Sequence, residues 1–353
     1  MKKKSLFASV VLAGGVLSSQ LAFADTNATI QAIDPATSLT QETVSPATAT
    51  GPLFEIKEGQ MSYPANYSFV MQSANFSNGN YVATVGAGKY TIFDAAGNAL
   101  TSNTWQNGTL FGISAAATMS NGFVVLAGGG GNFQIITDYD YVVKSGKWAQ
   151  GTSLINTAIG LADGRILLAG DSGKYAFMDG YGNSIKYGSW SHGATSITAG
   201  TQLADTGNIV LVGSGGKYNI LDANGNLIRS ATLTYVTTPN AVAQLSNGNI
   251  IIAGSSGRYE IINQSGITQY SATWSHGSSY AIQTITSLPS GRVFLGSLFS
   301  QYELLYPLGN SAGYGYIRPN TGGGFTLQTS LVTRLGYLMV GGQFGYWKLL
   351  TEN

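Results

Sequence analysis

The stretch Ala162-Asp163-Gly164-Arg165, followed by the apolar run 166–169, decides the fold. A tight turn with Gly before an apolar run recurs seven times, at steps of 41 to 45 residues. Its glycines are Gly79, Gly122, Gly164, Gly207, Gly248, Gly291 and Gly336. An aromatic residue after the next Gly-rich loop keeps the same step, at Tyr90, Phe133, Tyr175, Tyr218, Tyr259, Tyr302 and Tyr346. The chain is therefore an array of similar units.

The unit around Gly164 contains the pattern of four short strands. Its apolar run 166–169 is typical of a strand that is covered on both faces. A second strand is predicted at 174–178, a hairpin turn at 179–183 and a third strand at 184–190. Small residues fill 195–203, which suits a strand crowded around a central axis. That strand begins the next unit.

Repeats of this length with four strands each are typical of propeller blades. We therefore predict an all-β fold, a seven-bladed β-propeller with four antiparallel strands per blade, named a, b, c and d from the axis outwards. The segment 345–350 aligns with strand c, and no strand d follows it. Residues 52–63 can supply that strand, so an N-terminal strand is predicted to close the ring.

The N-terminal residues have the pattern of a signal peptide at 1–24. Lys2, Lys3 and Lys4 form a basic start, an apolar stretch follows, and Ala22-Phe23-Ala24 offers small residues at a cleavage site. Residues 25–51 are rich in Thr, Ala and Pro and are predicted to be a disordered linker, followed by the propeller at 52–353. We expect a protein exported to the periplasm, or secreted to the cell surface, of a bacterium.

Composition narrows the classes of partner. Only 9% of the residues are charged, with a formal net charge of +1, so no basic stripe is available for nucleic acid. Outside the leader no stretch is long and apolar enough to span a membrane. The chain has no Cys, and no ligand pattern indicates a metal or a cofactor. A surface rich in Ser, Thr, Asn and Gln favours a glycan, or an envelope or host surface protein, as partner.

The repeat also resembles those of bacterial β-propellers over about residues 52–353. Ala162 to Gly170, with Tyr175 and Trp190, looks like a kelch-type blade, although Tyr and Trp are farther apart than in kelch repeats. Residues 218–227 are similar to quinoprotein-type blades but lack the nearby Trp. The resemblance implies the fold, and no catalytic or cofactor residue is carried over from it.

The d–a and b–c loops of a propeller emerge on one face, where recurring residues form a candidate ligand site. Four d–a loops carry Trp and, two residues later, a hydrogen-bonding side chain; four b–c loops contribute a cation to the same rim. Indole, amide or imidazole, and a cation together are typical of sugar and other polar-ligand pockets. The candidate residues are Trp105, Asn107, Trp148, Gln150, Trp190, His192, Trp274, His276, Lys89, Lys174, Lys217 and Arg258.

Two readings of these residues stay open, because a Trp at the end of an outer strand also packs commonly between blades. No catalytic residue is predicted: Asp171 is the one acid placed in a b–c loop, whereas glycoside hydrolysis needs a carboxylate pair. The leading hypothesis is an exported, non-catalytic, lectin- or adhesin-like propeller that binds a polar surface partner, a glycan before a protein. The alternatives are a propeller enzyme with an external cofactor in the central channel, and a scaffold of an envelope assembly.

Overall fold

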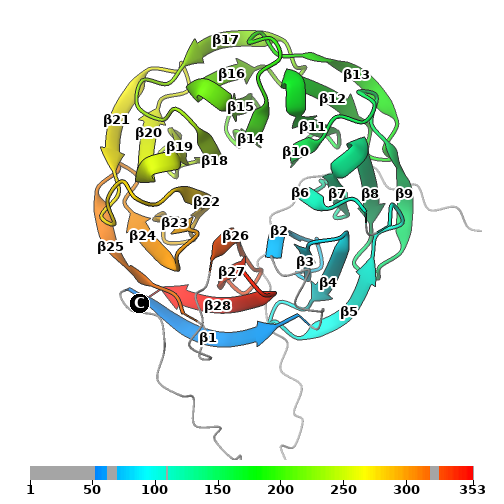
Figure 1. The fold of residues 1–353 in the computed structure, drawn as a ribbon, viewed down its shortest axis with the longest axis horizontal. Helices are drawn as coiled ribbons and strands as arrows, with labels where there is room; N and C mark the ends of the chain where they lie inside the picture. Colours follow the sequence, from blue (N-terminus) through cyan, green and yellow to red (C-terminus); the bar gives the residue numbers. More distant parts are fainter. Residues whose placement is uncertain (1–51, 62–69, 109, 319–325, 353) are drawn as a thin grey trace, which may run out of the picture. The chain divides into compact units, whose positions relative to one another are not determined.

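The computed structural model describes residues 52–61, 70–108, 110–318 and 326–352. The predicted signal peptide (1–24) and linker (25–51) lie outside the described residues. Within the described ranges, the strands pair into seven sheets of four antiparallel strands each. Figure 1 shows these sheets as blades around a common axis. The predicted seven-bladed β-propeller is therefore confirmed.

Each of the first six blades takes its strands in chain order from the axis outwards. Blades 1 to 3 comprise β2 (Val70–Asn75), β3 (Tyr81–Val85), β4 (Lys89–Phe93) and β5 (Ala99–Thr104); β6 (Ile113–Thr118), β7 (Val124–Gly128), β8 (Asn132–Ile136) and β9 (Val142–Lys147); and β10 (Ile155–Gly160), β11 (Ile166–Gly170), β12 (Lys174–Met178) and β13 (Ser184–Ser189). Blades 4 to 6 comprise β14 (Ile197–Gln202), β15 (Ile209–Gly213), β16 (Lys217–Leu221) and β17 (Leu227–Thr232); β18 (Pro239–Gln244), β19 (Ile250–Gly254), β20 (Arg258–Ile262) and β21 (Thr268–Thr273); and β22 (Ile282–Ser287), β23 (Val293–Ser297), β24 (Gln301–Leu305) and β25 (Ser311–Tyr316).

Blade 7 combines the two ends of the described chain. It comprises β26 (Leu327–Val332), β27 (Leu338–Gly342), β28 (Tyr346–Glu352) and, outermost, β1 (Leu53–Gln60). Single 3-10 turns follow strand b in blades 2 to 5, at η2 (Gly129–Gly131), η3 (Asp171–Gly173), η4 (Ser214–Gly216) and η5 (Ser255–Gly257). Among the described residues, no helix has the length and apolar character to cross a bilayer.

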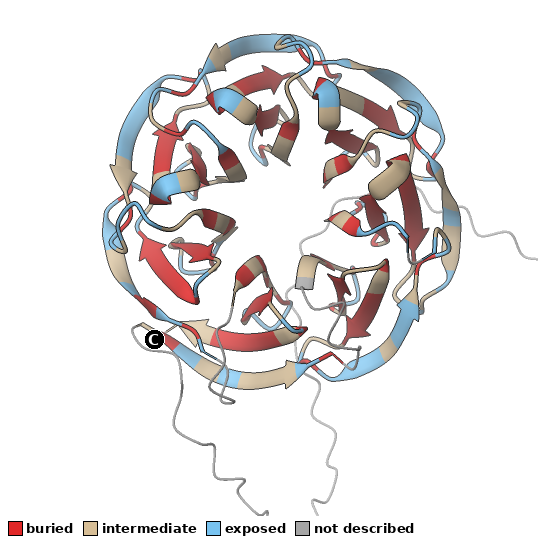
Figure 2. Cartoon of the chain, in the orientation of Figure 1, coloured by how far each residue is buried: buried red, intermediate tan, exposed pale blue. Residues whose placement is uncertain are grey.

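Burial explains why the apolar runs become strand b. Every residue of β11 is buried, whereas β13 at the rim of the same blade is mostly exposed, a gradient that Figure 2 shows around the ring. The turn before β11 contains Gly164, whose φ of 94° favours Gly, and its N–H donates to the carbonyl of Leu161 at 3.0 Å. The repeated turn therefore delivers an apolar strand to the middle of each blade.

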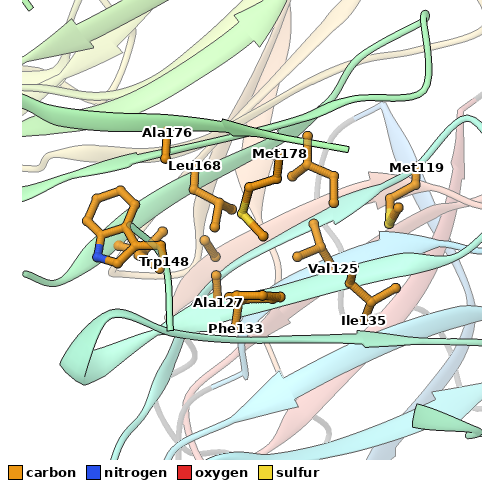
Figure 3. Packing of buried hydrophobic residues seen from close by; sticks show 12 residues of the cluster. Met119, Val125, Ala127, Phe133, Ile135, Trp148, Leu168, Ala176 and Met178 are labelled. Atoms are coloured by element: carbon orange, nitrogen blue, oxygen red, sulfur yellow. The ribbon is translucent and has the colours of Figure 1, made fainter. Parts of the chain in front are cut away.

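The blades adhere through apolar layers between neighbouring sheets. Figure 3 shows one of them, in which Phe133 and Trp148 of blade 2 pack with Leu168 and Met178 of blade 3. Neither face of a blade's middle strands is left to water, so each blade needs both neighbours. A closed ring satisfies that need for every blade.

The ring closes through β1, as predicted. β1 pairs antiparallel with β28 along its length, and the Nζ of Lys348 in β28 lies 2.5 Å from a carboxylate oxygen of Glu55 and 2.8 Å from one of Glu58. Lys348 is almost completely buried, at 1% exposure. Two carboxylates from β1 thus neutralise the ammonium group inside the closing blade.

Tyrosines of strand c link neighbouring blades through their hydroxyl groups. Tyr218 donates to the carbonyl of Gly266 and Tyr259 donates to the carbonyl of Gly309, both at 2.8 Å and both in the next blade. The hydroxyl oxygen of Tyr302 accepts the N–H of Leu53 at 3.3 Å, which ties blade 6 to the closing strand. The strand-c aromatics therefore belong to the junctions between blades.

The propeller is expected to lose stability at alkaline pH through three buried tyrosines, Tyr81, Tyr259 and Tyr302. Burial raises the pKa of Tyr302 from 10.0 to about 12 and also raises the pKa values of Tyr81 and Tyr259. A raised pKa in the folded state gives stability that is complete below pH 10 and is lost as the pH rises towards about 12. Urea unfolding at pH 8 to 12 measures this loss, and Tyr302→Phe should make it shallower. An equal loss in that variant would contradict the role of Tyr302.

Candidate functional site

The recurring Trp residues lie at the junctions between blades, on the face formed by the d–a and b–c loops. Trp105, Trp148, Trp190 and Trp274 are 1%, 3%, 4% and 2% exposed, so little of any indole is open to a ligand. The backbone N–H of Trp105 donates to the carbonyl of Gly88 at 2.8 Å, and its indole N–H donates to the carbonyl of Gly108 at 2.9 Å. A Cβ on Gly88 would lie 2.2 Å from that indole nitrogen. Each indole thus covers a b–c loop glycine.

Three other residues take the same place in the blades without this Trp. Leu233, Ile317 and Met61 are buried, and their N–H groups donate to the carbonyls of Gly216, Ser300 and Gly345, respectively. Met61 directly follows the closing strand β1. The search for recurring residues missed Met61, because it lies at the other end of the described chain from strands a, b and c of its blade.

The side chains two residues after Trp bridge to the following blade. Their donors reach the carbonyl of the next strand-c aromatic: Asn107 to Phe133 at 3.5 Å, Gln150 to Tyr175 at 3.0 Å, His192 to Tyr218 at 3.0 Å and His276 to Tyr302 at 3.0 Å. Each of these side chains thus contributes to a contact between two blades. A ligand role for these residues stays a prediction. The half-buried side chains two residues after each Trp are more accessible to a ligand than the buried indoles.

The predicted cations begin strand c in four blades and are half-buried. Lys89, Lys174, Lys217 and Arg258 hold equivalent positions on the same face. Lys174 donates from Nζ to the Ser153 hydroxyl at 3.0 Å, and the Arg258 guanidinium lies 4.8 Å from the centre of the Tyr235 ring. These cations line the outer part of the face, and a ligand role for them also stays a prediction.

The inner strands place a ring of polar side chains around the axis on this face. In every blade the pairing of strands a and b shifts register at the second residue of strand a, so that residue bulges out of the sheet. The bulged residues are Met71, Ser114, Asn156, Thr198, Asn240, Gln283 and Gln328. All seven line a cavity of about 370 Å³ together with Gln72, Asp171 and Ser196. We call these ten residues the channel mouth.

Part of the channel mouth is a belt of hydrogen bonds that runs from blade to blade. In each case a bulged side chain donates to the carbonyl of the first strand-a residue of the next blade: Ser114 to Ile155 at 2.5 Å, Asn156 to Ile197 at 2.9 Å, Thr198 to Pro239 at 2.7 Å and Asn240 to Ile282 at 3.0 Å. Blades 6 and 7 have the longer side chains Gln283 and Gln328 at this position. The mouth is therefore asymmetric.

Deeper in the channel, hydroxylated side chains lie beside amides in the lining. A second cavity of about 190 Å³ lies between the inner strands of six blades. Ser73 and Thr329 hydroxyls lie 2.8 Å apart, and the Ser330 hydroxyl lies 2.6 Å from those of Thr284 and Thr286. Hydroxyl pairs therefore join blade 7 to both of its neighbours.

Asp171 is the single charged residue among those that line the two cavities. It lies in η3, the b–c loop where the sequence placed it, and accepts hydrogen bonds from Asn156 at 3.1 Å and Ser196 at 3.2 Å. Among the described residues, no three His, Asp or Glu side chains gather in a metal-binding cluster. The mouth can thus offer many neutral donors and acceptors, and one carboxylate.

Comparison with known proteins supports the fold. No protein-family model and no curated protein matches the chain. Among solved structures, the chain is similar to the WD40 β-propeller domain of Doa1, with a TM-score of 0.66 and 10% sequence identity over 83% of this chain and 97% of that one. At this identity the likeness shows the architecture alone. The chain thus has the fold of the β-propellers.

Proposed function

We propose that this protein is an exported, non-catalytic propeller that binds a glycan at the channel mouth. The observation that carries the proposal is the ring of seven bulged residues, six of them amides or hydroxyls, around one cavity. β-Bulges are over-represented at sheet edges, at the rims of barrels and next to active sites, where they redirect a side chain. The predicted signal peptide at 1–24 supports action in the periplasm or at the cell surface.

The chemistry of the mouth favours a neutral, hydroxyl-rich ligand. Amide side chains such as Gln283 and Gln328 each offer donors and an acceptor, which match the hydroxyl groups of a sugar. The single carboxylate of Asp171 gives no cluster of charge that would select a strongly charged ligand. The rim cations, Lys89, Lys174, Lys217 and Arg258, are proposed to contact the outer part of the same ligand.

Replacing two amides of the mouth tests this function. Gln283→Ala with Gln328→Ala is expected to weaken glycan binding about tenfold, because each lost hydrogen bond contributes about 0.5–1.5 kcal/mol. Binding is measured on an array of neutral saccharides and then by titration calorimetry. Gln269→Ala is the matched control, since Gln269 is an exposed amide on the outer strand β21. If the purified wild-type protein retains no saccharide, or if the double variant binds as well as wild type, the proposal fails.

A further inference from the structure

The middle residue of the b–c turn differs between two sectors of the ring. In blades 1 to 5 it is small and takes a left-handed backbone conformation: Ala87, Gly130, Ser172, Gly215 and Ser256, with φ of 57° to 77°. In blades 6 and 7 the corresponding residues are Phe299 and Phe344. Both are exposed, at 60% and 43%. Two large apolar side chains thus replace small residues at one side of the face.

The backbone conformation of Phe344 is unfavourable for a residue with a large side chain. Its φ of 58° is left-handed, a conformation that a bulky side chain rarely adopts, and much of its ring faces water. Its carbonyl accepts a hydrogen bond from Gln60 at 2.9 Å, which a residue without a side chain would accept equally. The backbone contact therefore does not account for an aromatic side chain at this strained position.

The ring of Phe299 packs against a second aromatic ring. The rings of Tyr280 and Phe299 lie 4.9 Å apart between centroids, at an angle of 56°. Tyr280 comes from the loop that enters β22, whereas Phe299 comes from the turn after β23. The next residue, Ser300, has a left-handed φ of 64°, where the other six blades have Gly. Blade 6 thus also accepts strain at this turn, and it holds an exposed ring in a fixed place.

The strand register places both phenylalanines at the same end of their blades as the channel mouth. Ile282 pairs with Ser297, so Gln283 follows one partner and Phe299 lies two residues after the other. In the same way, Leu327 pairs with Gly342. Gln328 follows Leu327 directly, and Phe344 lies two residues after Gly342. Blades 6 and 7 are neighbours in the ring (Figure 1). The exposed rings and the two long amides therefore occupy one sector.

We propose that Phe299 and Phe344 are stacking platforms for sugar rings, and that the ligand is an oligosaccharide of at least two units that extends over blades 6 and 7. This inference rests on the proposed function. A pyranose ring has a face of C–H groups that packs on an aromatic ring and removes both surfaces from water, while a neighbouring unit of the same chain places its hydroxyls at Gln283 and Gln328. One exposed ring in each of two adjacent blades suits a chain of sugars rather than a single one.

Two variants test the platforms on an array of neutral saccharides printed as chains of one to six sugar units. Phe299→Ala is expected to weaken binding of the longer chains about tenfold, as for an aromatic anchor, and to leave single sugars almost unchanged. Phe344→Gly is expected to weaken binding of the longer chains and to raise the Tm by about 2 °C, because Gly relieves the left-handed strain. A side chain needed only for folding would lower the Tm instead.

Two matched variants control for general effects. Tyr306→Ala removes a ring that is 52% exposed in the c–d turn of blade 6, at the opposite end of the blade, and Ser256→Gly alters the equivalent b–c turn of blade 5. Both should bind like wild type.

If Gln283→Ala with Gln328→Ala weakens binding but the two Phe variants do not, the stacking role of the phenylalanines is contradicted and the proposed function stands. If wild type binds no saccharide of any length, both fail. Equal losses for single sugars and long chains would overturn the two-unit ligand.

Discussion

Lys348→Ala is expected to lower the free energy of unfolding by about 3–5 kcal/mol, the usual cost of removing one partner from a buried ion pair. The substitution leaves the carboxylates of Glu55 and Glu58 facing each other across the position of the lost ammonium group. Their repulsion acts between β1 and β28, the strands that close the ring. Urea unfolding followed by tryptophan fluorescence measures the loss.

Two further variants separate charge from packing at this site. Lys348→Met with Glu55→Gln and Glu58→Gln removes all three charges and should recover most of the stability, since a buried pair replaced by neutral groups is often close to neutral in stability. Lys147→Ala removes an exposed lysine from the outer strand β9 and should have little effect. A Lys348→Ala protein as stable as the Lys147 variant would show that the ion pairs do not hold β1.

Trp274→Ala is expected to cost about 3–5 kcal/mol, because it empties a buried site that the rest of the fold cannot refill. Its indole is 2% exposed in the layer between blades 5 and 6, and its N–H is bound to the carbonyl of Gly277. Trp274→Leu should cost less, since Leu233 holds the equivalent place in blade 4. The measurement is again the unfolding midpoint in urea, at unchanged slope.

The same variants decide between the two readings of the recurring Trp residues. Under the structural reading, Trp274→Leu retains most of the stability and all of the saccharide binding. A loss of binding in a Trp274→Leu protein that is still stable would instead assign the indole to the ligand. The control for binding is Tyr187→Ala, which removes an exposed ring from the outer strand β13.

The architecture could be predicted from sequence because its signals are local and repeated. A Gly such as Gly164 is favoured at a positive φ of 94°, and a strand such as β11 is apolar throughout because both of its faces are covered. Even the closing strand was predictable, since a blade that lacked strand d needed one. These rules act within a single unit and recur in each.

The candidate site was predicted less well, because it depends on register and on contacts between units. The bulge that turns Gln283 and Gln328 toward the axis is a property of strand pairing, and neither residue type signals it. The sequence identified the loops of His192 and His276, but only the structure shows that each imidazole bonds to the next blade. Phe299 and Phe344 depart from the repeat, so a search for recurring residues passes over them.

The pairing of β1, the outermost strand of blade 7, also determines when during synthesis the ring of blades can close. Among the strands of the described residues, β1 leaves the ribosome first, whereas β28, its partner, leaves last. Until β26, β27 and β28 have been synthesised, blade 7 is incomplete and its two neighbouring blades each lack cover on one side. Pairing across almost the entire length of a chain carries a high loop-closure entropy, which slows folding. Blade 7 therefore completes its four-stranded sheet only after β28 has been synthesised.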